Sequence, residues 1–311
     1  MSNTLYQKSL VSIDDISEGE VNLLYQKADE AKKVVAKQGA DDRLNGKIMA
    51  ALFFEPSSRT FSSFITAMQR LGGGIIPLNG MQNTSVAKGE SLEDSAKVFS
   101  SYADIIVTRF SEKGSTEKLA KSATVPVINA GDGIGEHPTQ ALLDCYTIEK
   151  HFESFGNLRV GMIGDLLNGR TVHSLTKLLL KLGTKKFIWV SPKSLKMPEY
   201  IKREVKKNKA DFVEAEKLEP TIGDLDVIYD TRVQKERFSN LKEYDRLKLA
   251  YIITPTLMKK AKKTAVLMHP LPRVGEIAIE VDRDPRALYL REQMRNGMYV
   301  RMALLDLILR K

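Results

Sequence analysis

The sequence contains a single cysteine, Cys145, among its 311 residues. One cysteine excludes disulfide bonds within the chain and a zinc site built from several of its own thiolates. The four histidines, His137, His151, His173 and His269, do not form a metal-binding motif such as H-E-x-x-H. We therefore expect a site without a metal and a protein without a cofactor.

Long hydrophobic runs are also missing. No stretch reaches the roughly 18 consecutive apolar residues that a membrane-spanning helix needs. The first ten residues, MSNTLYQKSL, lack the basic segment and apolar core of a secretory signal. Hydrophobic residues make up 42% of the chain and charged residues 28%, which is typical of a globular protein. We expect a cytoplasmic protein with no membrane partner, long enough for two domains.

The formal net charge of +9 raises the question of a nucleic-acid partner. However, the lysines are spread over many predicted helix faces, and no basic run is interleaved with aromatic residues for base stacking. Small anionic substrates account for a modest positive excess equally well, because a basic cleft attracts them. The charge alone does not decide between these two possibilities.

The most informative stretch lies between an apolar strand, Ile48–Phe54, and a helix with the i, i+3, i+4, i+7 apolar spacing of one buried face. Residues 55–60, Glu-Pro-Ser-Ser-Arg-Thr, connect the two. Ser57 or Ser58 can cap the helix, whose first-turn N–H groups have no partner within the helix. Arg59 adds a planar set of donors beside the positive end of the helix dipole. This combination predicts a phosphate-binding turn.

Strands and helices alternate along the rest of the chain, which predicts parallel sheets. A second alternation begins after a helix at 138–150, so this helix is expected to bridge two domains. We predict an α/β fold of two similar domains, each a parallel sheet flanked by helices, bridged by helices. The remaining predicted helices are 18–38, 91–102, 116–122, 172–182, 199–207 and 292–311, and the remaining strands are 104–108, 125–128, 159–163, 186–190, 226–229 and 265–268.

A glycine-rich stretch at 129–135 has the composition of a dinucleotide-binding loop but fails its pattern. After Gly131 and Gly133 the third glycine would fall at position 136, which is Glu136. No acidic residue closes a strand about twenty residues later, as the ribose contact would require. We therefore reject a nicotinamide-dependent oxidoreductase.

Polar side chains recur at strand ends and helix starts, where ligands bind in open α/β sheets. No nucleophile, carboxylate pair or metal-ligand set stands out among them. They predict a site that binds substrates with several negative charges and acts by orientation and electrostatic stabilisation. These residues are Arg59, Arg109, His137, Gln140, Arg170, Arg232 and Gln234, with Lys88 on a nearby polar loop.

Six segments together resemble the catalytic chains of aspartate carbamoyltransferases, within the aspartate/ornithine carbamoyltransferase superfamily. They occur in family order and span nearly the whole chain. The segments are F-F-E-P-S-S-R-T at 53–60, N-T-S-x-x-K-G-E at 83–90, G-D-G-x-x-x-H-P-T-Q-A-L-L-D at 131–144, G-D-L-x-x-G-R-T-V-H-S-L at 164–175, T-R-V-Q-K-E-R at 231–237 and H-P-L-P-R at 269–273.

The resemblance implies transfer of the carbamoyl group of carbamoyl phosphate to the amino group of L-aspartate, with release of phosphate, in de novo pyrimidine biosynthesis. It implies a carbamoyl phosphate-binding domain at 1–136, on which the helix at about 292–311 packs back, and an aspartate-binding domain at 137–291. It also implies a cytoplasmic homotrimer with shared active sites and no nucleic acid. Whether a separate regulatory chain binds is left open.

The resemblance assigns carbamoyl phosphate to three groups of residues. The phosphate would be held by Ser57, Ser58, Arg59, Thr60 and Arg109. The oxyanion of the tetrahedral intermediate would be stabilised by Thr60, Arg109 and His137, which with Arg59 are the implied catalytic residues. The carbamoyl NH2 would be held by Gln140 and by the backbone around Leu271 and Pro272. A neighbouring subunit would contribute Ser85 and Lys88.

The resemblance also assigns the aspartate contacts. Arg170 would bind the α-carboxylate, and Arg232 with Gln234 the side-chain carboxylate, with Lys88 nearby. Glu55 would pair with Arg170 and Arg237 to hold a closed, oriented form.

One residue departs from the family pattern, since Ser58 stands where a threonine is usual, but a hydroxyl and a backbone N–H remain. The nearest rival is an ornithine carbamoyltransferase, which shares the phosphate half. That family has a cysteine after the histidine of the last motif and lacks T-R-V-Q. Here the corresponding residue is Pro270, and Arg232 suits an anionic side chain, which favours aspartate.

Overall fold

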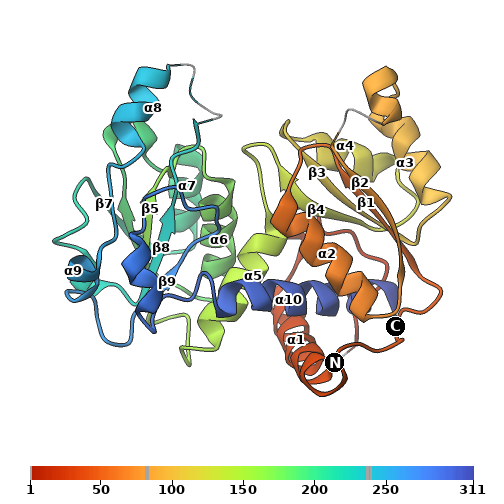
Figure 1. The fold of residues 1–311 in the computed structure, drawn as a ribbon, viewed down its shortest axis with the longest axis horizontal. Helices are drawn as coiled ribbons and strands as arrows, with labels where there is room; N and C mark the ends of the chain where they lie inside the picture. Colours follow the sequence, from red (N-terminus) through yellow and green to blue (C-terminus); the bar gives the residue numbers. More distant parts are fainter. Residues whose placement is uncertain (1, 81–83, 236–237, 239) are drawn as a thin grey trace. The chain divides into compact units, whose positions relative to one another are not determined.

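The computed structural model describes residues 2–80, 84–235, 238 and 240–311 (Figure 1). These form two compact units, the first reaching to Leu143 and including Arg295–Lys311, the second comprising Asp144–Met294. Both boundaries fall inside helices, α5 (Pro138–Glu149) and α10 (Glu292–Leu309). The chain thus divides within α5. The predicted domain boundary at 136/137 and the substrate expected for each domain stay predictions.

The first unit is built on a parallel sheet with the strand order β2-β1-β3-β4. The first strand, β1, lies between β2 and β3, so the strand order reverses beside it. Ligands bind at such a switch point in open α/β sheets, at the carboxyl ends of the strands. The elements are η1 (Ile13–Asp15), α1 (Glu18–Gln38), β1 (Ile48–Phe53), α2 (Ser58–Arg70), β2 (Gly74–Asn79), η2 (Ser85–Lys88), α3 (Leu92–Ser100), β3 (Ile105–Phe110), α4 (Ser115–Ser122) and β4 (Val127–Asp132).

Both faces of this sheet are covered by helices. On one face Leu52 packs in a buried cluster with Ala96 of α3 and Leu119 of α4. On the other face the ring of Phe53 meets the ring of Phe61 in α2 edge to face, with 5.2 Å between their centroids. Since successive strand residues point to opposite faces, a sheet buried on both sides needs a continuous apolar strand. This explains the apolar run that the sequence shows in β1.

The second unit repeats this plan with the strand order β7-β6-β5-β8-β9, all parallel. Its first strand, β5, again lies inside the sheet, and the order reverses between β5 and β8. The two similar parallel sheets with flanking helices confirm the predicted fold class. The elements are β5 (Arg159–Gly164), α6 (Arg170–Lys181), β6 (Lys186–Val190), η3 (Lys193–Leu195), α7 (Glu199–Lys207), β7 (Asp211–Ala215), η4 (Ile222–Asp224), β8 (Val227–Thr231), α8 (Leu241–Leu247), α9 (Pro255–Met258), β9 (Val266–Met268) and η6 (Ile279–Arg283).

The helix α1 begins and ends where the sequence predicts, because both ends carry strong signals. Ser17 at the N-cap accepts a hydrogen bond from Glu20 N, and Glu20 in turn accepts one from Ser17 N at 2.8 Å. Burial alone would raise the pKa of Glu20, but hydrogen bonds from Ser17, Lys8 and Thr4 lower it to about 2. Gly39 closes the helix with a φ of 84°, which glycine adopts without a Cβ clash.

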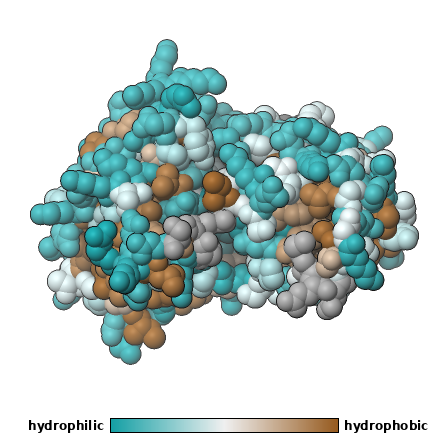
Figure 2. Space-filling model, turned by 90° about the horizontal axis from the view of Figure 1, so that it is seen from above, coloured by the Kyte–Doolittle hydropathy of each residue, from teal (hydrophilic) through white to brown (hydrophobic). Residues whose placement is uncertain are grey.

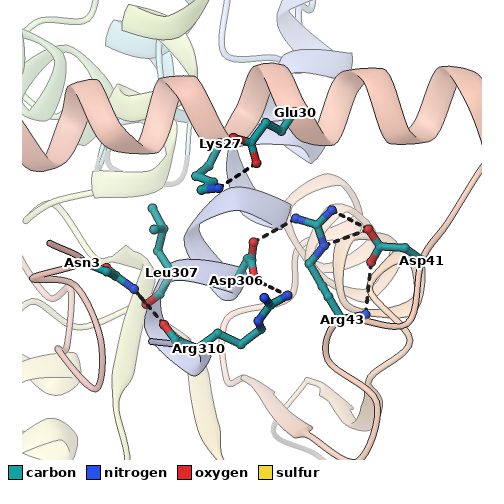
Figure 3. Close-up of polar contacts among 8 residues, drawn as sticks. All are labelled: Asn3, Lys27, Glu30, Asp41, Arg43, Asp306, Leu307 and Arg310. Atoms are coloured by element: carbon teal, nitrogen blue, oxygen red, sulfur yellow. Dashed lines mark hydrogen bonds and ion pairs between the residues drawn. The ribbon is translucent and has the colours of Figure 1, made fainter. Parts of the chain in front are cut away.

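The last turns of α10 are fastened to the first unit by polar contacts (Figure 3). Asn3 Nδ2 donates to the carbonyl oxygens of Leu307 and Arg310, at 2.8 and 2.7 Å. Arg43 Nη1 lies 2.9 Å from Asp306 Oδ2, and the Asp306 side chain is only 10% exposed. Arg43 Nε also donates to Asp41 Oδ2 at 2.8 Å. Residues near both ends of the sequence are therefore held together in one unit.

We expect Asp306→Asn to destabilise the protein by about 1–3 kcal/mol, because Arg43 would keep a largely buried charge with one carboxylate fewer. Calorimetric unfolding of the full chain measures this. Asp245→Asn is the matched control, because it breaks an exposed pair with Lys248 whose aspartate side chain is 62% exposed; no measurable shift is expected there. Equal shifts for both variants would contradict a structural role for the Asp306 contacts.

On the face shown in Figure 2 hydrophilic residues predominate, and hydrophobic residues form several separate patches. Tyr102, Val213, Val274 and Ile279 are among the large hydrophobic side chains that are more than half exposed. Within the described residues, no helix combines the length and the apolar character needed to cross a membrane.

Candidate active site

Arg109 lies at the switch point of the first unit and links three of its segments. Its carbonyl oxygen accepts hydrogen bonds from Phe54 N and Glu55 N, at 2.9 and 3.1 Å. Its guanidinium donates to Glu55 Oε1 at 3.2 Å and to Ala130 O at 3.4 Å. These contacts hold a cationic side chain that is 13% exposed against the turn that follows β1.

Glu55 therefore has an ion-pair partner that the sequence did not suggest. The predicted partners were Arg170 and Arg237. Arg237 lies outside the described residues, and the pairing of Glu55 with either arginine stays a prediction.

The turn after β1 leads directly into the N-terminus of α2. Ser57 occupies the N-cap position, but its side chain makes no capping hydrogen bond; instead its N–H donates to Asn79 Oδ1 at 3.2 Å. The first-turn N–H groups of α2 are therefore not used by this hydroxyl. Arg59 is exposed at the same turn and Thr60 is buried, 8% exposed. A helix start of this kind favours an anion through its N–H groups and its dipole.

His137 and Gln140 lie at the start of α5, beyond the glycine-rich loop, and are 4% and 9% exposed. The loop owes its glycines to close packing. Gly133 has a φ of 51°, and a Cβ there would lie 2.7 Å from both Lys113 N and Ser111 O. The backbone at Gly133 lies directly against another loop of the same unit, so close packing explains why a glycine is needed there.

Two loops meet at the switch point of the second unit, one after β5 and one after β8. Gln234 Nε2 donates to Asn168 O at 3.1 Å, and Asp165 Oδ1 accepts from Asn168 N at 2.9 Å. Gly164 permits this approach, because it has a φ of 107° and a Cβ there would lie 2.1 Å from Thr231 O. The contacts between these loops bring the segment before Arg170 next to the segment that carries Gln234.

The two predicted arginines of this unit extend from those loops. Arg170 is the first residue of α6 and is 9% exposed, whereas Arg232 follows β8 and is half-buried, with Nη1 3.5 Å from Val233 O. A guanidinium presents planar pairs of donors that match a carboxylate, and partial burial strengthens such a contact. The paired loops can therefore hold a small molecule with two carboxylates.

Two buried carboxyl groups near these loops have raised pKa values. Burial raises the pKa of Asp165, against the opposing effect of hydrogen bonds from Asn168 and Gln234. Burial, together with the charge of Glu276, raises the pKa of Asp230 well above its usual range. Both shifts are in the direction of the neutral form, because burial penalises the charged one.

The other predicted residues lie on loops. Ser85 and Lys88 are the ends of η2 in the first unit, and both are exposed. In the second unit Leu271 has a φ of 58° and is joined to the exposed Pro272 by a cis peptide bond. The assignment of these four residues to the site stays a prediction.

Sequence reasoning assigned no role to Asn168, Asp165 or Glu276. The one indication for Asp165 was its place in the recognised segment 164–175. Asn168 contacts Gln234, 66 positions away in the sequence, and Glu276 lies outside the recognised segments although it contacts the nearby His269, so neither was indicated.

Within the described residues, no three His, Cys, Asp or Glu side chains are grouped to hold a metal ion. The buried Cys145 is not suited to nucleophilic attack, because burial, with nearby Asp144 and Glu149, raises the pKa of its thiol well above the usual range. The described chemistry is that of anion binding and hydrogen-bond donation.

Comparison with known proteins matches both units to one family. Residues 8–150 match the carbamoyl-P binding domain of aspartate/ornithine carbamoyltransferases, and residues 156–308 match the Asp/Orn binding domain of the same family.

Individual relatives match along nearly the whole chain. The aspartate carbamoyltransferase catalytic subunit of Methanopyrus kandleri is 46% identical over 303 residues, covering 97% of each chain. The multifunctional protein pyr1-3 of Dictyostelium discoideum is 45% identical over 98% of this chain, which spans only 14% of that protein. The aspartate transcarbamoylase of Trypanosoma cruzi, crystallised with carbamoyl phosphate and aspartate, superposes with a TM-score of 0.92 at 38% identity, over 99% of this chain and 98% of the other. On this evidence, the chain belongs to the aspartate/ornithine carbamoyltransferase family.

Proposed function

We propose that this protein is an aspartate carbamoyltransferase of pyrimidine biosynthesis, which converts carbamoyl phosphate and L-aspartate to N-carbamoyl-L-aspartate and phosphate. The observation that carries the choice of aspartate is the joined pair of loops in the second unit, which present Arg170, Arg232 and Gln234. Two guanidinium groups suit the two carboxylates of aspartate, whereas the cationic side chain of ornithine would be repelled. The names of the relatives support the same choice.

The first unit binds carbamoyl phosphate in this proposal. The N-terminus of α2 binds the phosphate through its N–H groups, with Ser57, Ser58, Arg59 and Thr60. Arg109, held by Glu55 and Ala130, adds a fixed positive charge at the same switch point.

The reaction is an attack by the aspartate amino group on the carbamoyl carbon. A C–N bond forms and the carbonyl oxygen becomes an oxyanion. The carbonyl then re-forms, the C–O bond to phosphate breaks, and the proton lost by the amine passes to the departing phosphate. Thr60, Arg109 and His137 stabilise the oxyanion, and Arg59 stabilises the negative charge of the departing phosphate. Gln140 and the backbone at Leu271 and Pro272 hold the carbamoyl NH2.

The second unit orients the aspartate. Arg170 binds the α-carboxylate, and Arg232 with Gln234 binds the side-chain carboxylate. Fixing both carboxylates leaves the amino group little freedom, which lowers the entropic part of the barrier. Glu55 and Arg237 support the oriented form.

The exposed Ser85 and Lys88 of η2 are available to act on a neighbouring copy of the chain. We include a homotrimer with shared active sites in the proposal, together with a cytoplasmic location. Any separate regulatory chain would bind to such trimers without contributing residues to the reaction described above.

The test is product formation by the purified full chain, with carbamoyl phosphate and either aspartate or ornithine. We expect carbamoyl-aspartate, and an assembly of three chains of 34.9 kDa by light scattering. Citrulline as the product would retain the phosphate half and overturn the roles of Arg232 and Gln234. Absence of turnover with both amines, in a trimeric sample, would overturn the proposed function.

A further inference from the structure

The loop that follows β9 is held by three backbone N–H groups, each of which donates to a side chain. His269 N donates to Gln293 Oε1 at 3.0 Å, Leu271 N donates to His269 Nδ1 at 2.8 Å, and Val274 N donates to Glu276 Oε2 at 2.8 Å. These three hydrogen bonds involve backbone N–H groups of the loop and none of its carbonyl oxygens. An N–H anchor at each end and in the middle defines the path of the backbone.

The contacts of His269 fix which ring nitrogen carries the proton. Since Leu271 N is a donor, Nδ1 must accept and is unprotonated. The proton is then on Nε2, which donates to Glu276 Oε1 at 2.8 Å. The two side chains are 1% and 4% exposed, so water does not compete for these bonds.

The carboxylate of Glu276 maintains this tautomer. Burial alone would raise the pKa of Glu276, but hydrogen bonds from His269 and from Val274 N lower it below the usual value. An ionised carboxylate accepts with both oxygens, so it requires a donor at His269 Nε2 and another at Val274 N. A shift of the proton from Nε2 to Nδ1 would break both hydrogen bonds of the ring, the one to Glu276 and the one from Leu271 N.

A second chain of contacts supports the start of the loop. Gln293 Nε2 donates to Asp144 Oδ1 at 2.7 Å, and Asp144 Oδ2 accepts from Tyr229 OH at 2.7 Å. Asp144 and Gln293 therefore orient the acceptor that His269 N uses. The side chains that form this network are buried within the second unit, namely Asp144, Tyr229, His269, Glu276 and Gln293.

Anchoring Leu271 N has a geometric consequence for the carbonyl groups around it. This N–H and the carbonyl of Pro270 belong to one planar peptide group, so the carbonyl points away from the His269 ring. Leu271 itself has an unusual φ of 58°, and φ together with ψ sets the direction of its own carbonyl. The loop backbone is thereby positioned by the His269 ring, which accepts from Leu271 N.

We propose that His269 and Glu276 form a positioning pair, which sets the path of the backbone around Leu271 and thereby aims the carbonyls that hold the NH2 of carbamoyl phosphate. This inference rests on the proposed function and concerns one group of one substrate. Both residues act through the backbone and touch no substrate atom. The pair would make the enzyme selective for a substrate that can donate hydrogen bonds at this position.

Two substitutions of His269 separate its two contacts. In His269→Asn, the side-chain oxygen lies close to the position of Nδ1 and can still accept from Leu271 N. In His269→Gln, the amide nitrogen lies close to the position of Nε2 and can still donate to Glu276, but the Leu271 contact is lost. A third variant, Glu276→Gln, keeps the shape of the side chain but replaces one carboxylate oxygen with an NH2 group. Of the two donors, His269 Nε2 and Val274 N, one then faces another donor and loses its hydrogen bond.

The readout compares carbamoyl phosphate with acetyl phosphate, which carries a methyl group in place of the NH2. We expect His269→Gln and Glu276→Gln to lower kcat/KM for carbamoyl phosphate about tenfold or more, which corresponds to one lost hydrogen bond. With acetyl phosphate the same variants should change kcat/KM less than about threefold. His269→Asn should keep more of the preference for carbamoyl phosphate than His269→Gln.

Inhibition by inorganic phosphate is the second readout, because phosphate lacks the NH2 and should bind all variants equally well. His151→Gln and His151→Asn are matched controls, since His151 Nε2 also contacts a glutamate, Glu292, at 2.9 Å but lies outside the loop. They should leave the ratio of the two substrates unchanged.

An unchanged substrate ratio in His269→Gln and Glu276→Gln would overturn the positioning pair. A parallel loss with both substrates and a weaker phosphate inhibition would also overturn it, since that pattern indicates general disruption. Failure of the unsubstituted chain to carbamoylate aspartate would instead overturn the proposed function.

Discussion

Arg59→Ala is expected to lower kcat by about 10³-fold or more. Arg59 is exposed in the first turn of α2, where the helix N-terminus favours an anion. Its guanidinium would both bind the phosphate and stabilise the charge that develops as phosphate leaves. The second contribution grows in the transition state, so kcat falls as well as the affinity for carbamoyl phosphate. Steady-state kinetics with aspartate at saturation measures this.

Arg59→Lys separates charge from geometry. A lysine keeps the charge but loses the planar pair of donors, so we expect activity between that of Arg59→Ala and the unsubstituted protein. Arg203→Ala removes one positive charge from an exposed position of α7 in the second unit and should not affect turnover. Near-normal kcat in Arg59→Ala would remove this residue from the active site.

Arg232→Ala is expected to lower kcat/KM for aspartate by about 10²-fold, through a higher KM for aspartate. Arg232 is half-buried after β8, beside the loop contact between Gln234 and Asn168. Loss of its guanidinium would leave the side-chain carboxylate of aspartate without a charged partner. The KM for carbamoyl phosphate should change little, because its phosphate contacts lie in the first unit.

The contrast between the two substrates is the control for Arg232→Ala. Initial rates are measured as a function of each substrate with the other held constant. Unchanged kinetics for aspartate would contradict the assignment of Arg232. An equal loss with both substrates would point to a defect in the fold of the second unit.

Where local signals decide the structure, the sequence predicted it closely. The limits of α1 follow from the capping pair of Ser17 and Glu20 and from Gly39, and β6 and α7 also begin and end as predicted. The strand β4 was predicted to end at Ile128 but runs on to Asp132. Its length is set by pairing with β3, as in Ile106 with Val127 and Phe110 with Asp132, which the local sequence does not show.

Elements with weak local patterns were missed. The strand β7 is an edge strand that pairs with β6 alone among the described strands, and its residues are exposed or half-buried. Its charged residues do not mark a strand, because an edge strand is free to expose them. The helices α8 and α9 are short, so their apolar spacing does not extend far enough to be recognised.

Candidate site residues could be proposed from the sequence because arginine, histidine and glutamine at strand ends carry information about ligands. What could not be predicted is the support around them. Asp165 meets the Gln234 segment across 69 positions of sequence, and Glu55 meets Arg109 across 54. Such contacts depend on strand order, which is settled only by the assembled sheet.

The division of the chain within α5 and α10 has a consequence for the order of folding during synthesis. All residues of the second unit have been made once Met294 has left the ribosome, so that unit can fold as a whole. The first unit begins earlier in the sequence, yet it still lacks Arg295–Lys311, including the Asp306 that Arg43 contacts. The unit that is begun first is therefore completed last, and until then its core lacks the buried side chains of α10, such as Leu304 and Leu305.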